Sequence, residues 1–133
     1  MSKRQERINI INLLYRHFVL QHDILTTKQE AYDFSQMVTT STETIQVEKI
    51  LANLSDIIVK INQHLKPEWN FARLSNYHKA VLVYGVYEIC YKQLAKAIVI
   101  NESLEILKLY GEDTDFSYIN SVLDQVSFLK YKN

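Results

Sequence analysis

Only two glycines and one proline occur among the 133 residues of this chain, and this scarcity strongly constrains its fold. β-Sandwiches, β-barrels and glycine-rich nucleotide-binding folds need many tight turns and positive-φ positions, which glycine and proline commonly supply. Apolar residues make up 47 % of the chain, enough for one hydrophobic core at this length. The sequence therefore predicts an all-α, compact single domain over residues 1–133, built from about six or seven helices.

Apolar residues recur every three or four positions through most of the chain, which is the period of an amphipathic helix. Residues 23–27 are predicted to form a loop, Pro67 is predicted to end a helix, and Ser75 is a suitable N-cap for the next one. On this basis we predict helices over residues 2–22, 28–39, 43–65, 76–93, 96–110 and 116–129, followed by a short polar tail at 130–133.

The segment 80–91 is apolar on nearly all sides, which is typical of a buried central helix. Gly85 lies in its middle and predicts the close approach of a neighbouring helix, because glycine there costs about 1 kcal/mol relative to alanine. Cys90, the only cysteine, is expected to be a buried small side chain, and one cysteine is in keeping with a reducing cytosol. In the helix over 96–110, Tyr110 is predicted to lie on the inner face.

The formal net charge is zero, from 15 Lys and Arg against 15 Asp and Glu. General nucleic-acid coat proteins and membrane-surface proteins usually carry a clear basic excess, so any RNA binding must come from a local patch. The sequence contains no apolar run of the ~20 residues that a membrane span requires, and no signal-peptide pattern. We therefore expect a cytoplasmic protein without a membrane partner.

Sequence patterns of the common catalytic, metal and nucleotide sites are absent. The four histidines form no H-x-x-x-H pair, and there is no G-x-x-x-x-G-K-[ST], G-x-G-x-x-G or G-x-S-x-G. We expect no metal, no cofactor and no enzymatic activity. Glu88 is the one carboxylate inside the apolar helix. It could be a general acid with a raised pKa, or a hydrogen-bonded carboxylate of the core, and the structural interpretation is favoured.

The first sixteen residues carry four basic side chains against one acidic side chain, Glu6. Positive charge at a helix N-terminus opposes the helix dipole, so helix stability does not explain it, whereas phosphate binding would. The segment 1–7 is thus either a phosphate-binding arm or a solvated terminus. The many tyrosines leave a similar choice, since they could stack on bases but mostly fall at core-facing positions.

The second half of the chain resembles the NusB family in three blocks. The first block contains Trp69, Arg73 and Leu74, followed by residues 79–82 and 87–89. Residues 98–104 are similar to the family's V-A-I-N-E block, and residues 118–124 to its closing F-V-N-G-V-L-D block. The order and spacing of the blocks agree with the family, and the N-terminal helix also fits.

The resemblance implies an all-α fold of about seven helices and a role in transcription antitermination at ribosomal-RNA operons. It implies that the protein binds boxA-like single-stranded RNA together with a NusE-type small-subunit ribosomal protein, within the RNA polymerase antitermination complex. Both monomers and homodimers occur in the family. By position, the resemblance assigns RNA-binding roles to Lys3, Arg4, Arg7, Tyr15 and Tyr118, and partner-binding roles to Tyr15, Tyr77 and His78.

Two other functional interpretations remain open. The chain could be a protein–protein interaction module of the same fold in ribosome biogenesis, with little RNA binding of its own. The zero net charge favours this alternative, as do Gln5 and Glu6, which dilute the basic arm. An enzyme using Glu88 is the third interpretation, but no second catalytic group stands near this residue in the sequence and no pattern indicates a substrate.

Overall fold

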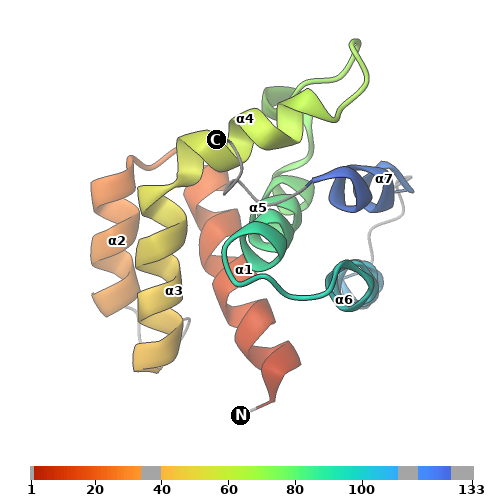
Figure 1. Cartoon of the computed structure of the whole chain (residues 1–133). Helices are drawn as coiled ribbons and strands as arrows, with labels where there is room; N and C mark the ends of the chain where they lie inside the picture. Colours follow the sequence, from red (N-terminus) through yellow and green to blue (C-terminus); the bar gives the residue numbers. More distant parts are fainter. Residues whose placement is uncertain (1, 34–39, 111–116, 127–133) are drawn as a thin grey trace, which may run out of the picture.

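The computed structural model describes residues 2–33, 40–110 and 117–126 of the chain. Within these residues the chain forms seven α-helices, one short 3-10 helix and no β-strand (Figure 1). The predicted all-α fold of six or seven helices is confirmed. The elements are α1 (Lys3–Leu20), α2 (Ile24–Asp33), α3 (Ser41–Ala52), α4 (Leu54–Gln63), the 3-10 helix η1 (Phe71–Arg73), α5 (Asn76–Cys90), α6 (Lys96–Leu109) and α7 (Ser117–Gln125).

Helix α5 is the centre of the fold and packs against α1, α4, α6 and α7. Figure 1 shows α2 and α3 side by side beyond α1, with α6 and α7 on the other side of α5. All residues of α5 from 80 to 90 are buried, Cys90 included, which confirms the predicted central helix. The positions of α1 and α6 around it determine which side chains are available for function.

Gly85 of α5 lies directly against the side chain of Leu123 of α7. A Cβ atom built on Gly85 would lie 2.9 Å from Cδ2 of Leu123, which is closer than real Cβ atoms come to a neighbour. Leu123 is fully buried. The predicted close approach of a neighbouring helix is therefore confirmed, and the helix is α7.

Polar side chains cap several of the helices. Ser2 accepts a hydrogen bond from the backbone N–H of Gln5 at the start of α1, and Ser75 accepts one from His78 at the start of α5, as predicted. Thr40 and Glu43 form a reciprocal capping box at the start of α3. These bonds satisfy backbone donors that have no partner within the helix.

The helix predicted over 43–65 is wrong in one respect, because the chain forms two helices that meet at Asn53. The backbone of Asn53 leaves the helical conformation with φ −117° and ψ 14°, and its side-chain amide donates to the carbonyl of Lys49. Asparagine side chains compete for backbone groups in this way and favour helix ends. The apolar stripe continues through both helices, with Val47 and Ile50 buried in α3 and Ile57 in α4, so the pattern did not reveal the break.

The loop predicted over 23–27 is also wrong, because α2 already begins at Ile24. Asp23 accepts a hydrogen bond from the backbone N–H of Thr26 at 2.8 Å, which is the interaction of an N-cap aspartate. Residues 34–39 of the second predicted helix and the tail 130–133 lie outside the described residues. The helices predicted over 2–22, 76–93 and 96–110 occur as α1, α5 and α6, which end one to three residues earlier than expected. Helix α7 lies within the helix predicted over 116–129, of which residues 116 and 127–129 are outside the described ones.

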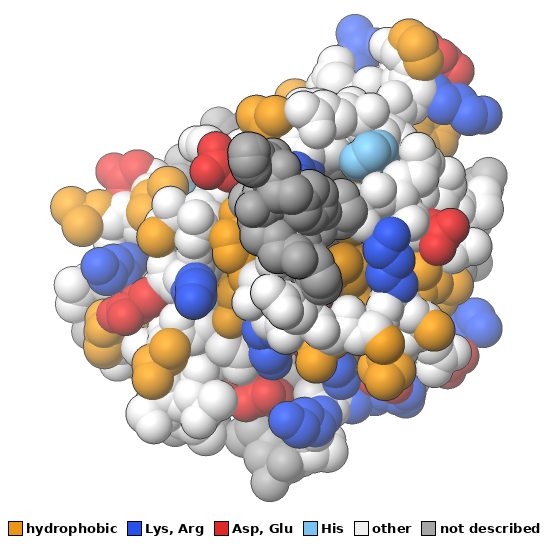
Figure 2. Space-filling model, in the orientation of Figure 1, with side chains coloured by type: hydrophobic (Ala, Val, Ile, Leu, Met, Phe, Trp, Pro, Cys, Tyr) orange, Lys and Arg blue, Asp and Glu red, His pale blue; other side chains and the backbone are white. Residues whose placement is uncertain are grey.

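The surface carries both signs of charge. In Figure 2, lysine and arginine side chains are interspersed with acidic ones over the visible face, as the zero net charge requires. Among the described residues, no helix combines the length and apolar character needed to cross a membrane. A charged ligand would therefore have to bind at a local group of side chains.

Candidate functional site

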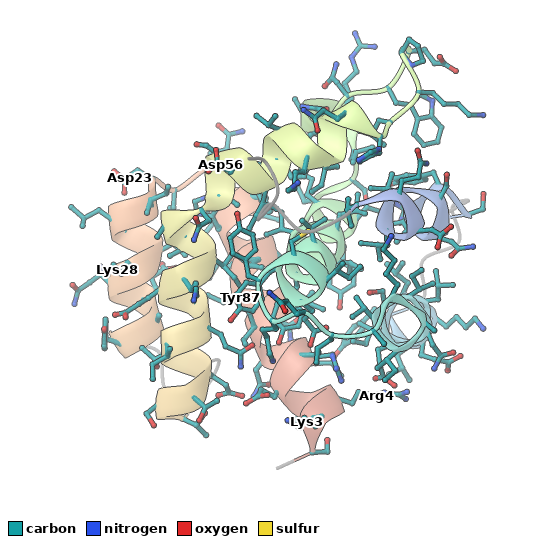
Figure 3. All side chains as sticks on the ribbon, viewed as in Figure 1. Lys3, Arg4, Asp23, Lys28, Asp56 and Tyr87 are labelled. Carbon is teal, nitrogen blue, oxygen red and sulfur yellow. The ribbon has the colours of Figure 1, made fainter. Side chains whose placement is uncertain are left out.

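The basic end of α1, which we define as Lys3 and Arg4, lies at the free N-terminal turn of that helix (Figure 3). Lys3 is exposed, and among the described residues it makes no ion pair. Arg4 lies on the side of α6 and forms a two-pronged ion pair with Glu102. Its Nε donates to Oε1 at 2.9 Å and its Nη2 to Oε2 at 3.0 Å. The two basic residues thus differ, since Lys3 is available and Arg4 is already paired.

Arg7 is buried, whereas a basic arm that contacts RNA would need it at the surface. The residue is only 8 % exposed, and its Nε donates to both carboxylate oxygens of Glu88 on α5, at 3.0 and 3.1 Å. The reason is helical geometry, because position 7 shares one side of α1 with the buried residues Ile11 and Leu14, and this side faces α5. One of the three cations assigned to the predicted arm, Arg7, therefore lies in the core.

Four charged groups of alternating sign connect the core to the basic end. The exposed fraction of the side chain rises along the series, from 2 % for Glu88 and 10 % for Arg7 to 19 % for Glu102 and 41 % for Arg4. Nη1 of Arg7 lies 3.9 Å from Oε1 of Glu102, which joins the two ion pairs. We call this series the α1–α5–α6 charge network.

The pKa shifts within the network follow from burial and pairing. Burial raises the pKa of Glu88, while the hydrogen bonds and charge of Arg7 oppose that rise. The hydrogen bonds from Arg4 lower the pKa of Glu102, so that this carboxylate stays ionised. Because both oxygens of Glu88 are engaged by Arg7, the structure supports the structural interpretation of this residue rather than the catalytic one.

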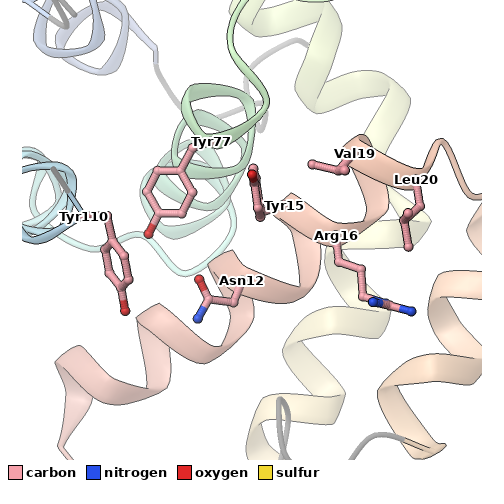
Figure 4. A pocket seen from close by; sticks show the side chains of 7 residues that line it. All are labelled: Asn12, Tyr15, Arg16, Val19, Leu20, Tyr77 and Tyr110. Carbon is pink, nitrogen blue, oxygen red and sulfur yellow. The ribbon is translucent and has the colours of Figure 1, made fainter. Parts of the chain in front are cut away.

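A hollow of about 570 Å³ lies farther along the same helix, and we call it the tyrosine hollow (Figure 4). The rings of Tyr15 and Tyr77 meet edge to face at 5.5 Å between centroids, and those of Tyr77 and Tyr110 lie 5.4 Å apart. Tyr15 is 41 % exposed, whereas Tyr77 is buried. The residues that line the hollow come from α1, α5 and the end of α6: Asn12, Tyr15, Arg16, Val19, Leu20, Tyr77 and Tyr110.

The structure thus brings together Tyr15 and Tyr77, which the sequence assigned to one partner-binding surface. Tyr110 was missed, because its predicted place on the inner face of a helix is wrong. It is the C-cap residue that follows α6, and it is half exposed. A helix end turns the chain away from the periodic face, so the helical period no longer specifies the direction of that side chain.

His78 and Tyr118 lie together in a second aromatic group. Nδ1 of His78 is 2.5 Å from the hydroxyl oxygen of Tyr118, and the Tyr118 ring meets the Trp69 ring edge to face at 4.6 Å. His78 is buried, and its small exposed part lines a hollow that it shares with Tyr118. Tyr118 and Trp69 are more open and line two small hollows of about 310 and 390 Å³. Trp69 is thus the aromatic neighbour that the sequence interpretation did not assign.

Arg4 and the tyrosine hollow share one side of α1, whereas Lys3 faces the start of α3. Arg4 and Tyr15 are eleven residues apart, which is about three helical turns, so they lie in line at roughly 16 Å from each other. Helix α6 runs beside them, with Glu102 at Arg4 and Tyr110 close to the Tyr15–Tyr77 pair. A ligand lying along this side can therefore contact charged groups at one end and aromatic groups at the other.

Metal binding has no evident site in the part of the chain that the structure describes, where no group of three or more His, Cys, Asp or Glu side chains could hold an ion. Arg4, Arg7, Glu88 and Glu102 are instead paired with one another. The side of α1 that carries Arg4 and the tyrosine hollow thus presents a guanidinium group at one end and aromatic rings at the other.

Known proteins resemble this chain in sequence and in fold. The family model of the NusB family matches residues 4–128. The transcription antitermination protein NusB of Sulfurimonas denitrificans is 30 % identical over 128 residues, covering 95 % of this chain and 96 % of that protein. The protein of the same name from Helicobacter hepaticus is 30 % identical over 145 residues, covering 99 % and 85 %. That of Wolinella succinogenes is 39 % identical over 74 residues, which are 56 % of this chain and 54 % of the relative. Among solved structures, T. maritima NusB superimposes with a TM-score of 0.75 at 24 % identity, covering 93 % of this chain and 89 % of the other.

Proposed function

Because this chain belongs to the NusB family, we propose that it acts as a transcription antitermination factor that binds boxA-like single-stranded RNA together with a NusE-type ribosomal protein. The observation that carries this proposal is the alignment of Arg4 and the tyrosine hollow on one side of α1, with Lys3 in the same first turn of the helix. In this proposal the protein works in the cytoplasm, within the RNA polymerase antitermination complex.

The RNA contact is electrostatic at the basic end. Lys3 presents an exposed ammonium group, and Arg4 presents the guanidinium N–H groups that Glu102 does not use. The N-terminal end of α1 adds the positive pole of the helix dipole. Tyr15 and Tyr118 provide aromatic rings for unstacked bases. Arg7 contributes as a positioning residue, since it fixes the first turns of α1 against α5 from inside the core.

The protein partner contacts the tyrosine hollow. Exposed apolar side chains surround it, with Val19 and Leu20 on α1 and Tyr110 after α6. Aromatic anchors in a hollow of this kind are the residues that most often dominate the energy of a protein interface. Tyr77 supports the exposed ring of Tyr15 from below. The buried His78 has an indirect role in this proposal, holding Tyr118 in place.

Lys3→Ala is expected to weaken RNA binding about fivefold at low salt and to reduce the slope of log affinity against log salt by about 0.7, the value for one phosphate contact on a single strand. The measurement is a fluorescence titration of a boxA-like RNA at several salt concentrations, with the NusE-type protein present. Lys28→Ala is the matched control, because Lys28 is an exposed lysine on α2, on the far side of the molecule (Figure 3). Equal losses in the two variants would argue against the assigned RNA contact.

Tyr15→Ala is expected to weaken binding of the NusE-type protein at least tenfold, about 1.4 kcal/mol, because it removes an exposed aromatic anchor from the hollow. Isothermal titration calorimetry without RNA measures this directly. Tyr32→Ala provides the control, since Tyr32 is an exposed tyrosine on α2 whose hydroxyl donates to Glu48. Unchanged partner affinity in Tyr15→Ala, or an equal loss in Tyr32→Ala, would show that the partner binds elsewhere.

A protein-interaction module with little RNA binding of its own is the second candidate function. It is favoured by the zero net charge and by the pairing of Arg4 and Arg7 with carboxylates. The two titrations separate the candidates. Partner binding that depends on Tyr15, combined with no RNA binding even in the complex, would support the second candidate and contradict the first.

A further inference from the structure

The carboxylate of Glu102 binds Arg4 in the same way as an RNA phosphate would. Carboxylates and phosphates both accept two parallel hydrogen bonds from one guanidinium group. Glu102 uses this two-pronged mode, with Nε–Oε1 and Nη2–Oε2 distances of 2.9 and 3.0 Å. The carboxylate of Glu102 thus occupies one of the two-pronged binding edges of Arg4.

Glu102 is the fixed member of this pair, and Arg4 is the member that can move. Glu102 lies inside α6, its carboxylate is mostly covered, and Arg7 stands 3.9 Å behind it. Arg4 lies in the first turn of α1, and its long side chain is 41 % exposed. Because Arg4 is partly open to water, which can replace part of the hydrogen bonding, rearranging this pair costs less free energy than breaking the buried Arg7–Glu88 pair.

We propose that Glu102 competes with RNA phosphate for Arg4 and thereby sets the RNA affinity of the basic end. This inference rests on the proposed RNA-binding function. Lys3 and Arg4 raise the affinity for RNA in that function, whereas Glu102 lowers it. When RNA binds, a phosphate either displaces Glu102 from Arg4 or is held by the remaining N–H groups against the repulsion of the carboxylate. In both cases the negative charge of Glu102 opposes the phosphate.

The chain offers a closely matched control for this effect. Glu105 lies one turn farther along α6, and its carboxylate pairs with Lys108 at 3.4 Å instead of with Arg4. Glu102→Gln and Glu105→Gln remove the same charge from the same helix and keep the size of the side chain. Only the first substitution releases Arg4, so the difference between the two variants isolates the competition.

Glu102→Gln is expected to bind RNA about threefold to tenfold more tightly than the wild type at low salt, with a salt slope steeper by about 0.7. Glu105→Gln is expected to stay within about twofold of the wild type. The titration uses the full chain with the NusE-type protein, and both a boxA-like RNA and a scrambled RNA of the same length. The gain should appear with both RNAs, because phosphate competition does not depend on base sequence.

A double variant tests whether the gain in RNA affinity arises through Arg4. In Arg4→Gln/Glu102→Gln the gain should vanish, since no guanidinium remains to be released, and thermal unfolding verifies that every variant is folded. If the wild type binds RNA and Glu102→Gln binds no more tightly than Glu105→Gln, this inference is overturned while the proposed function stands. If neither the wild type nor Glu102→Gln binds either RNA, both are overturned.

Discussion

Replacing Arg7 by methionine is expected to lower the free energy of unfolding by about 3–5 kcal/mol, because it leaves the carboxylate of Glu88 buried without its partner. Glu88 is 2 % exposed, and Arg7 donates to both of its oxygens. The nearest remaining cation, Nζ of Lys92, is 3.9 Å from Oε2 of Glu88 and only partly replaces the lost charge. Urea unfolding followed by circular dichroism measures the loss, and an unchanged denaturant slope would show that the unfolded state is the same.

The pH dependence of this variant gives a second readout. Burial already raises the pKa of Glu88, and removing Arg7 takes away the main opposing influence. The folded variant then binds a proton more tightly than the unfolded chain does, so its stability falls as pH rises above the ordinary glutamate pKa. The deficit relative to the wild type should therefore be smallest at acidic pH and grow towards neutrality.

Two control variants show whether the cost comes from the buried charge. Arg7→Met/Glu88→Leu removes both charges and should recover most of the lost stability, as buried ion pairs replaced by apolar side chains commonly do. Arg4→Met breaks the partly exposed pair with Glu102 and should lower the melting temperature much less than Arg7→Met does. A loss below about 1 kcal/mol in Arg7→Met would contradict the assigned structural role of this residue.

The Arg7–Glu88 pair also shows where sequence interpretation ends. By the helical period Arg7 falls on the same side of the first helix as Ile11 and Leu14, and Glu88 is the one carboxylate in the apolar run of the central helix. Each observation alone allowed two meanings. The two residues are 81 positions apart, and only the antiparallel packing of α1 on α5 brings them together. No local pattern contains that relative orientation, so a resemblance-based assignment of Arg7 to RNA could not be corrected from the sequence.

Features governed by local chemistry could be predicted better. The buried α5, the cap at Ser75 and the close approach at Gly85 depend on propensity and on a period within one helix, and all three were found. The break at Asn53 was missed because the apolar stripe continues through it. In the candidate site, the resemblance associated Tyr15 with Tyr77, but Tyr110 enters only through the way α6 ends beside them.

Because Gly85 contacts Leu123, the effect of Gly85→Ala on stability is expected to depend on which residue stands at position 123. Leu123→Ala is expected to cost about 2–5 kcal/mol of unfolding free energy, because it removes a fully buried side chain that fixes α7 on α5. In the wild type, Gly85→Ala places a Cβ atom 2.9 Å from Cδ2 of Leu123. The overpacking costs about 1–3 kcal/mol against a gain of about 1 kcal/mol in helix propensity, so the single variant is expected to lose up to about 2 kcal/mol and to gain nothing.

In the Leu123→Ala background, the same Gly85→Ala substitution should stabilise the protein by about 1 kcal/mol, because the atoms that it would strike are gone and the helix propensity remains. Urea unfolding of the four proteins gives the coupling energy of the cycle, expected at about 1–3 kcal/mol in favour of the double variant. If Gly85→Ala stabilised both backgrounds equally, Leu123 would have to move aside without cost. In that case the packing of α7 against α5 would not require a glycine at position 85. The presence of a poor helix former in the middle of the central helix would then need another explanation.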